Sequence, residues 1–479
     1  MLKGASPRRA LSLGLGGVLL LLGLALTFRP VVQGDGVGYF SYLHAGLVRH
    51  SLDLGPEYAA ASAAGVNSNP ADLEAPTATG RPADYFPIGP ALLAAPAYVG
   101  ALVAGGPRQA AYAPMLVGAF TLASLLAGLL ALLLCWRLTR SAVAVAAAAL
   151  CTPLMFYLVY EPSYSHTFSA FAVTAFVWAW WRGREDRSAP GWLGLGVLAG
   201  LVAITRWQDA PMAAIALLTP PPPGARWRAL LLVPGALVML APQLAVDQAI
   251  FGTWWPQRPA GLGLDPFAGH QLQVLLSSWH GLFVWHPVTA VAAAGSLLVR
   301  DPRLRAACIF ALVAETLIDG AAPDWWGGAA FGARRFIDLA PFWAIGLAAL
   351  ASRLPAAIAW AGTGLLTAWN AVLIANLQYV TSGNADPGYA GLLSGQVAAV
   401  RFLPHLVAQG AVVRGLFLWR LTGAGPRPWG ALAWLAAEAA CVAVVVVLLG
   451  ARRGPWQERM DGEEPELELR SPHWEGARP

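Results

Sequence analysis

The chain consists mostly of long apolar runs separated by short polar segments that contain arginine, glycine and proline. A helix needs about 20 mainly apolar residues to cross the hydrocarbon core of a bilayer, and about twelve stretches of this kind fit the sequence. The stretches are 11–28, 114–135, 142–160, 167–182, 191–205, 207–220, 229–250, 287–300, 304–320, 337–352, 354–377 and 431–450. The pattern therefore predicts an all-α polytopic membrane protein, with 207–220 shorter than a full crossing requires.

Arginine clusters between these runs predict the orientation of the chain. Short loops rich in Lys and Arg stay in the cytoplasm. The clusters are Arg137/Arg140, Arg182/Arg184/Arg187, Arg226/Arg228, Arg300/Arg303/Arg305 and Arg452/Arg453. We therefore expect residues 1–10 and the acidic tail 451–479, which we expect to be disordered, to be cytoplasmic. The external loops would then be 29–113, 251–286, 319–336 and 378–430.

Two apolar segments need separate interpretation. The run 11–28 is longer than the 7–15 apolar residues of a signal peptide and is not followed by a small-residue cleavage site, so it predicts an uncleaved span. Segment 86–104 is apolar enough to cross, but a crossing there would put Arg137 and Arg140 outside. We expect a helix that lies in the outer leaflet, with proline breaks. In the last external loop, 390–400 and 406–421 are expected to form interfacial helices.

Composition excludes several classes of protein. Hydrophobic residues make up 57% of the chain and charged residues 12%, whereas soluble domains carry about 25% charged residues. The net charge of +5 resides in short loops and not in a stripe that would bind nucleic acid. The four cysteines form no CxxC pair, so neither a disulfide framework nor a metal knuckle is expected. The expected partner is the lipid bilayer, and nucleic acid is not.

Polar residues gather at the outward ends of the predicted spans. Charged groups near a bilayer are costly, so their position is informative. The set is Asp35, Glu161, His166, Arg206, Asp209, Asp247, His280, His286, Asp324, Arg334, Arg335 and Asp338. Arginine pairs bidentately with phosphate oxygens, and a carboxylate can accept a proton from an attacking hydroxyl. The set predicts one external cleft suited to transfer from a lipid-linked phosphate, unless each Arg and Trp is only an interfacial anchor.

Five segments form a recognisable series along the chain: Asp35-Gly36-Val37-Gly38-Tyr39-Phe40, Tyr85-Phe86-Pro87-Ile88-Gly89-Pro90, Glu161-Pro162-Ser163-Tyr164-Ser165-His166, Thr205-Arg206, and Trp325-Trp326-Gly327-Gly328 followed by Phe331-Gly332-Ala333-Arg334-Arg335-Phe336. In this order they resemble membrane glycosyltransferases of the GT-C superfamily, of the protein O-mannosyltransferase and lipid A aminoarabinose transferase type. The likeness covers roughly residues 10–350. It implies a GT-C-like transmembrane catalytic module at 11–352 with juxtamembrane helices in loop 29–113, followed by C-terminal spans within 353–450.

The resemblance also implies a function. An inverting enzyme of the bacterial inner membrane would move a sugar from a polyprenyl-phosphate donor to an acceptor hydroxyl on a protein, lipid or polysaccharide of the cell envelope, at a site that faces the periplasm. Asp35 would be the general base, and Arg206, Arg334 and Arg335 would bind the donor phosphate. The implied substrate-binding residues are Tyr39, Tyr85, Glu161, His166, His280, Trp325 and Trp326. No cofactor is expected, and the histidine spacing does not indicate a divalent metal.

The sequence departs from the family in two places. Gly36 stands where many members have Glu, so the second acid is missing or comes from Asp53, Glu57 or Asp84. The basic residue expected before the proline-rich helix is also absent, and Arg81 is the nearest substitute.

Several roles have alternatives. Asp35 lies in a good turn sequence and can instead cap a helix that begins near Val37. Arg334 and Arg335 are adjacent and would not share a helix face, so we expect only one, Arg334, to meet the phosphate. Arg206 can also be a snorkelling anchor. A transporter or lipid flippase, or a non-catalytic scaffold with this fold, are the alternative functions.

Overall fold

The computed structural model describes residues 28–67, 73–106, 109–259, 261, 263–379, 385–408, 439–440 and 443–444. Residues 1–10, the tail 451–479, nearly all of the predicted spans 11–28 and 431–450, and most of the predicted helix 406–421 lie outside this part. The predictions for those segments therefore stay predictions.

The described part is helical. Its α-helices are α2 (Gly36–Leu47), α3 (Gly55–Ala63), α5 (Gly89–Gly105), α6 (Pro114–Thr139), α7 (Ala142–Leu150), α8 (Leu154–Val159), α9 (His166–Arg182), α10 (Ala189–Thr205), α11 (Leu232–Phe251), α12 (Gln271–Leu276), α13 (Leu282–Trp285), α14 (Pro287–Ser296), α15 (Pro302–Gly320), α16 (Ala340–Ala351), α17 (Ala356–Tyr379) and α18 (Gly388–Ala408). Three segments are 3₁₀-helices: η1 (Trp207–Leu218), η2 (Pro223–Leu231) and η3 (Arg334–Leu339). Within the described residues, β-pairing is confined to one bridge between Pro76 and Pro82. The predicted all-α class is confirmed.

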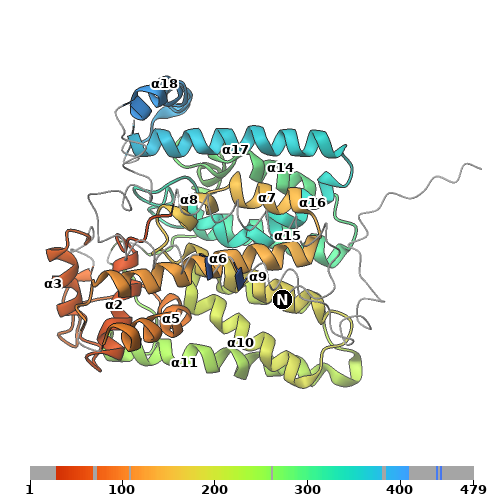
Figure 1. Ribbon diagram of the computed structural model, residues 1–479. Helices are drawn as coiled ribbons and strands as arrows, with labels where there is room; N and C mark the ends of the chain where they lie inside the picture. Colours follow the sequence, from red (N-terminus) through yellow and green to blue (C-terminus); the bar gives the residue numbers. More distant parts are fainter. Residues whose placement is uncertain are drawn as a thin grey trace, which may run out of the picture.

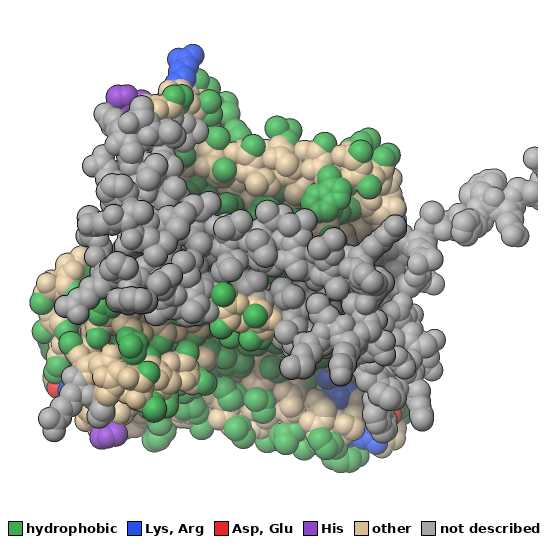
Figure 2. Space-filling model, viewed as in Figure 1, with side chains coloured by type: hydrophobic (Ala, Val, Ile, Leu, Met, Phe, Trp, Pro, Cys, Tyr) green, Lys and Arg blue, Asp and Glu red, His purple; other side chains and the backbone are tan. Residues whose placement is uncertain are grey.

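Three described helical segments are long and apolar enough to cross a membrane: Pro114–Thr139, Pro223–Phe251 and Ala356–Leu377. The last two form opposite edges of the helix array in Figure 1, where α17 and α11 lie far apart. Their outward side chains are apolar, as Val233, Leu237 and Leu365 illustrate, and Figure 2 shows hydrophobic side chains over both edges with few charges. This surface is that of a membrane protein, whereas the number of crossings stays a prediction.

Three of the arginine clusters predicted to be cytoplasmic meet in space. Arg228 pairs with Asp186 at 3.2 Å, and Arg303 lies 4.0 Å from Glu185. Helices α10 and α15 begin beside this cluster. They are 17 and 19 residues long and end at Thr205 and Gly320. At 1.5 Å per residue these helices are about 25–29 Å long, close to the thickness of the hydrocarbon core. Residues that follow Thr205 therefore lie a membrane thickness away from the arginine cluster.

Helix α9 lies at the centre of the packing. Nearly every side chain along it is buried, including Phe168, Phe176 and Trp180. It contacts α6, α10, α16 and η3. Because its neighbours fix it on all sides, its first residue, His166, is held at a defined position.

The predicted span 142–160 is wrong as a single helix. It consists of α7 and α8, separated by a break at residues 151–153. Pro153 has no N–H to continue the helical hydrogen bonds. In the break, the carbonyl oxygens of Leu150 and Thr152 accept hydrogen bonds from the Asn370 side chain at 2.8 and 3.0 Å. The break is therefore stabilised by α17, more than two hundred residues away.

Other boundaries also differ from prediction. Segment 207–220 is the 3₁₀-helix η1, which contains Pro211. The predicted spans at 287–300 and 337–352 are shortened, because α14 ends at Ser296 and residues 334–339 form η3. The helix expected in 86–104 is α5, which includes Pro96 and packs against α2, α6 and α10. One helix, α18, covers the predicted interfacial helix 390–400 and the first residues of the predicted helix 406–421.

Candidate active site

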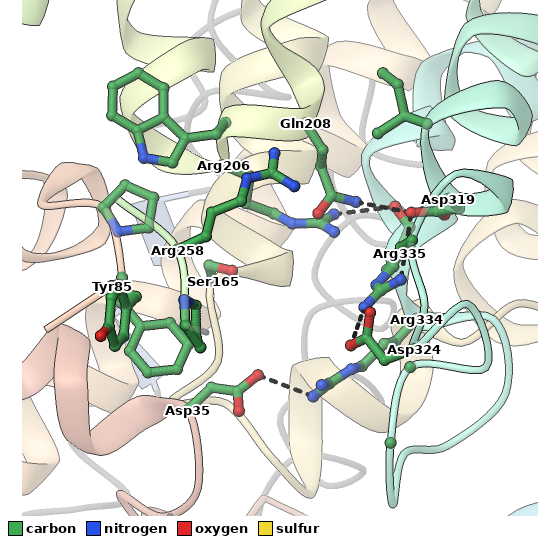
Figure 3. A pocket seen from close by; sticks show the side chains of 18 of the residues that line it. Asp35, Tyr85, Ser165, Arg206, Gln208, Arg258, Asp319, Asp324, Arg334 and Arg335 are labelled. Carbon is green, nitrogen blue, oxygen red and sulfur yellow. Dashed lines mark hydrogen bonds and ion pairs between the residues drawn. The ribbon is translucent and has the colours of Figure 1, made fainter. Parts of the chain in front are cut away.

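A cavity of about 460 Å³ lies where the start of α2, the start of α9 and the end of α10 meet. Figure 3 shows the side chains of most residues that line it. They are Asp35, Tyr39, Tyr85, Phe86, Pro87, Ser165, His166, Arg206, Trp207, Gln208, Gln257, Arg258, Pro259, Leu264, Ile318, Asp319, Ala322, Asp324, Gly327, Gly328, Arg334 and Arg335. The cavity contains six of the twelve polar residues predicted to line one cleft: Asp35, His166, Arg206, Asp324, Arg334 and Arg335.

An ion pair between Asp35 and Arg334 crosses this cavity. The Oδ2 atom of Asp35 lies 3.0 Å from a guanidinium nitrogen of Arg334, and both side chains retain some exposure, at 21% and 16%. Asp35 occupies the N-cap position of α2, but its side chain makes no capping hydrogen bond. The carboxylate faces Arg334 instead (Figure 3), so the capping alternative does not explain it.

Close packing of residues 34–36 positions Asp35. Gly34 has a φ of +55°, and a Cβ there would collide with the Tyr164 hydroxyl. A Cβ on Gly36 would collide with the Ser163 side chain. Glutamate therefore cannot occupy position 36 while this turn packs against residues 163–164. The second acid of the pattern that the sequence resembles therefore has no room at position 36.

Arg206 and Arg335 form a second charged layer. Arg335 pairs with Asp324 at 2.6 Å and lies 3.8 Å from Asp319. Arg206 donates to the backbone oxygen of Arg335 at 3.0 Å and lies 3.7 Å from Asp209. Arg206 is buried and paired, which is not the geometry of a snorkelling surface anchor.

Both Arg334 and Arg335 line the cavity, so the helix-face argument for choosing one of them does not apply, and the expectation that Arg334 alone meets the phosphate stays a prediction. They stand at the very start of the 3₁₀-helix η3, just after Ala333, whose ψ of 67° is not helical. The rule that adjacent residues diverge applies to the interior of an α-helix, and these residues are not in one.

Three of the predicted substrate-binding residues line the cavity. Tyr39 donates to the Ser165 hydroxyl at 3.0 Å and packs against Phe86, and Tyr85 contacts Phe251. His166 lies against the rings of Tyr157 and Tyr164. Although His166 is buried, neither of its ring nitrogens has a hydrogen-bond partner among the described residues. An unpaired imidazole beside a cavity is available to a ligand hydroxyl.

The other four predicted substrate-binding residues lie outside the cavity lining. His280 is hydrogen-bonded through Nδ1 to the backbone oxygen of Trp326 at 2.8 Å. Trp326 stacks on Trp279, and Trp325 packs edge-on against Trp326. This aromatic group braces the loop that leads to Arg334 and Arg335.

Glu161 lies behind the Asp35–Arg334 pair and not within the cavity lining. Its Oε1 atom is 3.5 Å from the Gln33 amide nitrogen. Burial raises the pKa of Glu161 to about 7, against a smaller opposing effect of the Arg334 charge. A carboxyl group with such a pKa can change its protonation state near neutral pH.

The proposed sources of the missing second acid are engaged elsewhere. Glu57 pairs with His44 at 2.8 Å and with Arg49 at 2.5 Å, and Asp84 accepts hydrogen bonds from Tyr58 and from the backbone of Phe86. Asp53 accepts a hydrogen bond from the Gly55 N–H at the start of α3. None of the three lines the cavity, whose other carboxylates are Asp319 and Asp324. Arg81 donates to the Ala249 backbone and also lies outside the lining.

Arg258 is a cavity residue that sequence reasoning missed. Its side chain is exposed and makes no ion pair or hydrogen bond with any described residue. The sequence did contain a signal for this residue, because Arg258 is the one Lys or Arg in the predicted external loop 251–286. An unpaired guanidinium in a cavity is suited to an anionic ligand.

Comparisons with known proteins return one structural likeness. No protein-family model matches the chain, and no curated protein matches it. Among solved structures, the chain is similar to the crystal structure of ArnT from Cupriavidus metallidurans in the apo state. The TM-score is 0.47 and the sequence identity is 14%, and the match covers 92% of this chain and 76% of that chain.

Proposed function

We propose that the protein is a membrane glycosyltransferase that moves a sugar from a polyprenyl-phosphate donor to an acceptor hydroxyl. The observation that carries the proposal is a single cavity in which the carboxylate of Asp35 faces Arg334, with three further arginines in the same lining. Such a transfer needs a base for the acceptor and positive charge for the leaving phosphate, and little else from the protein.

In the proposed reaction, the acceptor oxygen attacks the anomeric carbon while Asp35 takes the hydroxyl proton. The bond from the anomeric carbon to the phosphate oxygen breaks with inversion, and the lipid phosphate departs as an anion. Arginine can stabilise that anion without giving up a proton, because its guanidinium stays charged. A positioned general base typically contributes about 10²–10⁴-fold to the rate.

Arg334 is suited to link the two halves of this reaction. In the structure it is held by Asp35 and lies over the Tyr164 ring at 5.3 Å. A bound phosphate would compete with Asp35 for the same guanidinium group. Donor binding would thereby weaken the ion pair and leave the carboxylate freer to accept a proton.

Aromatic residues beside Arg258 support a lipid-linked donor. Trp254 and Trp255 are exposed, and Phe267 is 93% exposed. All three belong to the external loop that carries Arg258. Aromatic rings are enriched at the membrane interface, where they contact acyl chains and headgroups. A phosphate bound by Arg258 would therefore have its polyprenyl chain close to a lipid-facing surface.

The orientation follows from the two charged regions. The arginine cluster that contains Arg228 and Arg303 would be cytoplasmic by the positive-inside rule. The cavity lies beyond the opposite ends of α10 and α15. In a bacterial inner membrane the cavity would face the periplasm, where acceptors of the cell envelope are found.

The experiment measures sugar transfer and donor binding separately. Mass spectrometry of envelope glycans, lipids and glycoproteins from a deletion strain identifies the product that the enzyme makes. Complementation with Asp35→Asn should restore expression but leave transfer at least 10²-fold below wild type, whereas donor binding persists. Asp53→Asn is the matched control, because Asp53 lies in the same external loop and outside the cavity.

The outcomes separate the candidate functions. Full transfer by Asp35→Asn would rule out Asp35 as the base. An unchanged envelope in the deletion strain, together with bound donor, would favour a scaffold. Substrate-dependent exposure of the cavity to both sides of the membrane would favour a transporter or flippase.

A further inference from the structure

Three buried carboxylates converge next to the cavity. Asp209 comes from η1, Glu315 from α15 and Asp338 from η3, and each is 0% exposed. One oxygen from each lies within 4.8 Å of the other two. These acids come from three elements separated in sequence, so the fold brings their charges together.

Each of the three carboxylates has at least one oxygen without a hydrogen-bond partner among the described residues. Neither oxygen of Asp338 accepts a hydrogen bond from a described residue, and the same holds for Oε2 of Glu315 and Oδ1 of Asp209. Burying a charged group without a partner is costly, and buried acids are normally paired or bound to a metal. Asp338 is fully buried, and only its Oδ1 atom has a cation nearby, the Arg206 guanidinium at 4.0 Å. Its Oδ2 atom has no partner among the described residues, which points to a missing ligand.

The remaining oxygens of this group are fixed by hydrogen bonds. The Ser169 hydroxyl donates to Oδ2 of Asp209, and the Gln208 amide donates to Oε1 of Glu315 at 2.9 Å. In each case the other oxygen of the same carboxylate has no hydrogen bond to a described residue. This is how outer-shell groups orient the ligands of a metal ion.

Nearby arginines do not balance the negative charge. Arg206 lies 3.7 Å from Asp209 and 4.0 Å from Asp338, and Arg335 lies 3.8 Å from the neighbouring buried Asp319. Four buried acids, counting Asp319, thus share two arginines. Arg335 is also shared with Asp324. A charge of about +2 is needed, from a divalent ion or from two protons.

We propose that Asp209, Glu315 and Asp338 bind one divalent cation of the oxygen-preferring class, Mg²⁺, Mn²⁺ or Ca²⁺. An all-carboxylate set selects these hard ions over zinc or copper. Metal–oxygen distances of about 2.1–2.4 Å let two ligands of one ion lie at most about 4.2–4.8 Å apart, and the three oxygens lie within 4.8 Å of one another. Water would complete the coordination shell.

The site is linked to the cavity through Arg206 and Gln208, which both line it. An ion coordinated by Asp209 and Asp338 would neutralise carboxylates that otherwise interact with Arg206. The Arg206 guanidinium then has more of its charge available to an anion in the cavity. The cation would therefore strengthen anion binding without touching the anion itself.

The test measures Mn²⁺ binding to the full-length protein in detergent after removal of metals with EDTA. Electron paramagnetic resonance of free Mn²⁺ should give one bound ion per chain, displaced by Mg²⁺ or Ca²⁺. Asp338→Asn and Glu315→Gln should each weaken binding at least tenfold. Asp247→Asn is the matched control, because Asp247 is a buried aspartate outside the cluster and should leave binding unchanged.

A thermal measurement keeps the test valid if one variant folds poorly. Mn²⁺ at a fixed concentration above its Kd for wild type should raise the Tm of wild type and Asp247→Asn, because a ligand that binds only the folded state stabilises it, and should raise that of Glu315→Gln less. Wild type without bound Mn²⁺ would mean that protons balance the acids and would overturn the proposal, as would a wild-type Mn²⁺ affinity in both cluster variants. No sugar donor is present, so the outcome is independent of glycosyl transfer.

Discussion

Asp35 and Arg334 are about three hundred positions apart in the chain, yet their side chains are 3.0 Å apart. Glycines bring Asp35 to this place by allowing residues 34–36 to pack on residues 163–164. The 3₁₀-helix η3 presents Arg334 from the other side. Reactivity at this site therefore depends on backbone packing as much as on the two charged groups.

Arg258 gives a prediction about donor affinity. Since its guanidinium has no protein partner among the described residues, its removal breaks no ion pair there. Arg258→Ala should raise the KM for the polyprenyl-phosphate donor about tenfold, the loss expected for one charged hydrogen bond of about 1.5 kcal/mol, with a smaller change in kcat. Steady-state kinetics checks this. Arg401→Ala, an exposed arginine on α18 outside the cavity lining, should behave as wild type.

The buried carboxyl group of Glu161 should make the stability of the folded protein depend on pH. Burial raises the pKa of its carboxyl to about 7 from an ordinary 4.5. Between these pH values the unfolded chain releases the proton while the folded protein keeps it, so the contribution of Glu161 to stability is largest below pH 4.5 and is lost as pH rises to about 7. The Tm of Glu161→Gln minus the Tm of wild type should therefore increase from pH 5 to pH 8. A Tm difference that is the same at both pH values would contradict the assignment.

At the scale of elements, the junction of α7 and α8 shows how one polar side chain stabilises a helix break. Asn370 on α17 is buried and donates to the carbonyl groups of Leu150 and Thr152 at the break between the two helices. This bond pair also holds α17 against α7. The helix break and the position of α17 are thus stabilised by the same contact.

Asn370→Ala should destabilise the protein clearly. It leaves two buried carbonyl oxygens without these donors, and each unsatisfied group costs about 1–3 kcal/mol. A lower Tm in detergent, with α-helical content unchanged at low temperature, is the expected result. Leu365→Ala is the control on the same helix, because Leu365 is 72% exposed and should have little effect. Equal Tm values for the two variants would contradict this role of Asn370.

At the scale of the whole molecule, charge is divided between two ends. Ion pairs among residues 184–187, 226–228 and 300–305 form one end, and the cavity lies beyond the far ends of α10 and α15. Cysteine labelling of intact cells checks the predicted orientation. In a cysteine-free background, Phe267→Cys should react with an impermeant maleimide from outside, and Asp186→Cys only after permeabilisation. The reverse pattern would place the cavity in the cytoplasm and exclude a periplasmic reaction.

The sequence by itself determined the membrane class, the helical fold and six of the polar residues that line the cavity. Apolar runs and arginine-rich loops carry this information locally, because each segment must satisfy its own backbone and meet lipid or water. Asp35, Arg206, Arg334 and Arg335 were recognisable for the same reason, since charges at the ends of apolar runs are rare and costly.

Tertiary structure alone decided which of these residues meet. The break at Pro153, the pairing of Asp35 with Arg334, and the position of Arg258 depend on contacts between segments far apart in the chain. The cluster of Asp209, Glu315 and Asp338 is another example, because each acid lies in an ordinary local sequence and only packing places their oxygens within 4.8 Å. Periodicity describes one segment at a time, whereas the distance between two segments is fixed by how all the others pack.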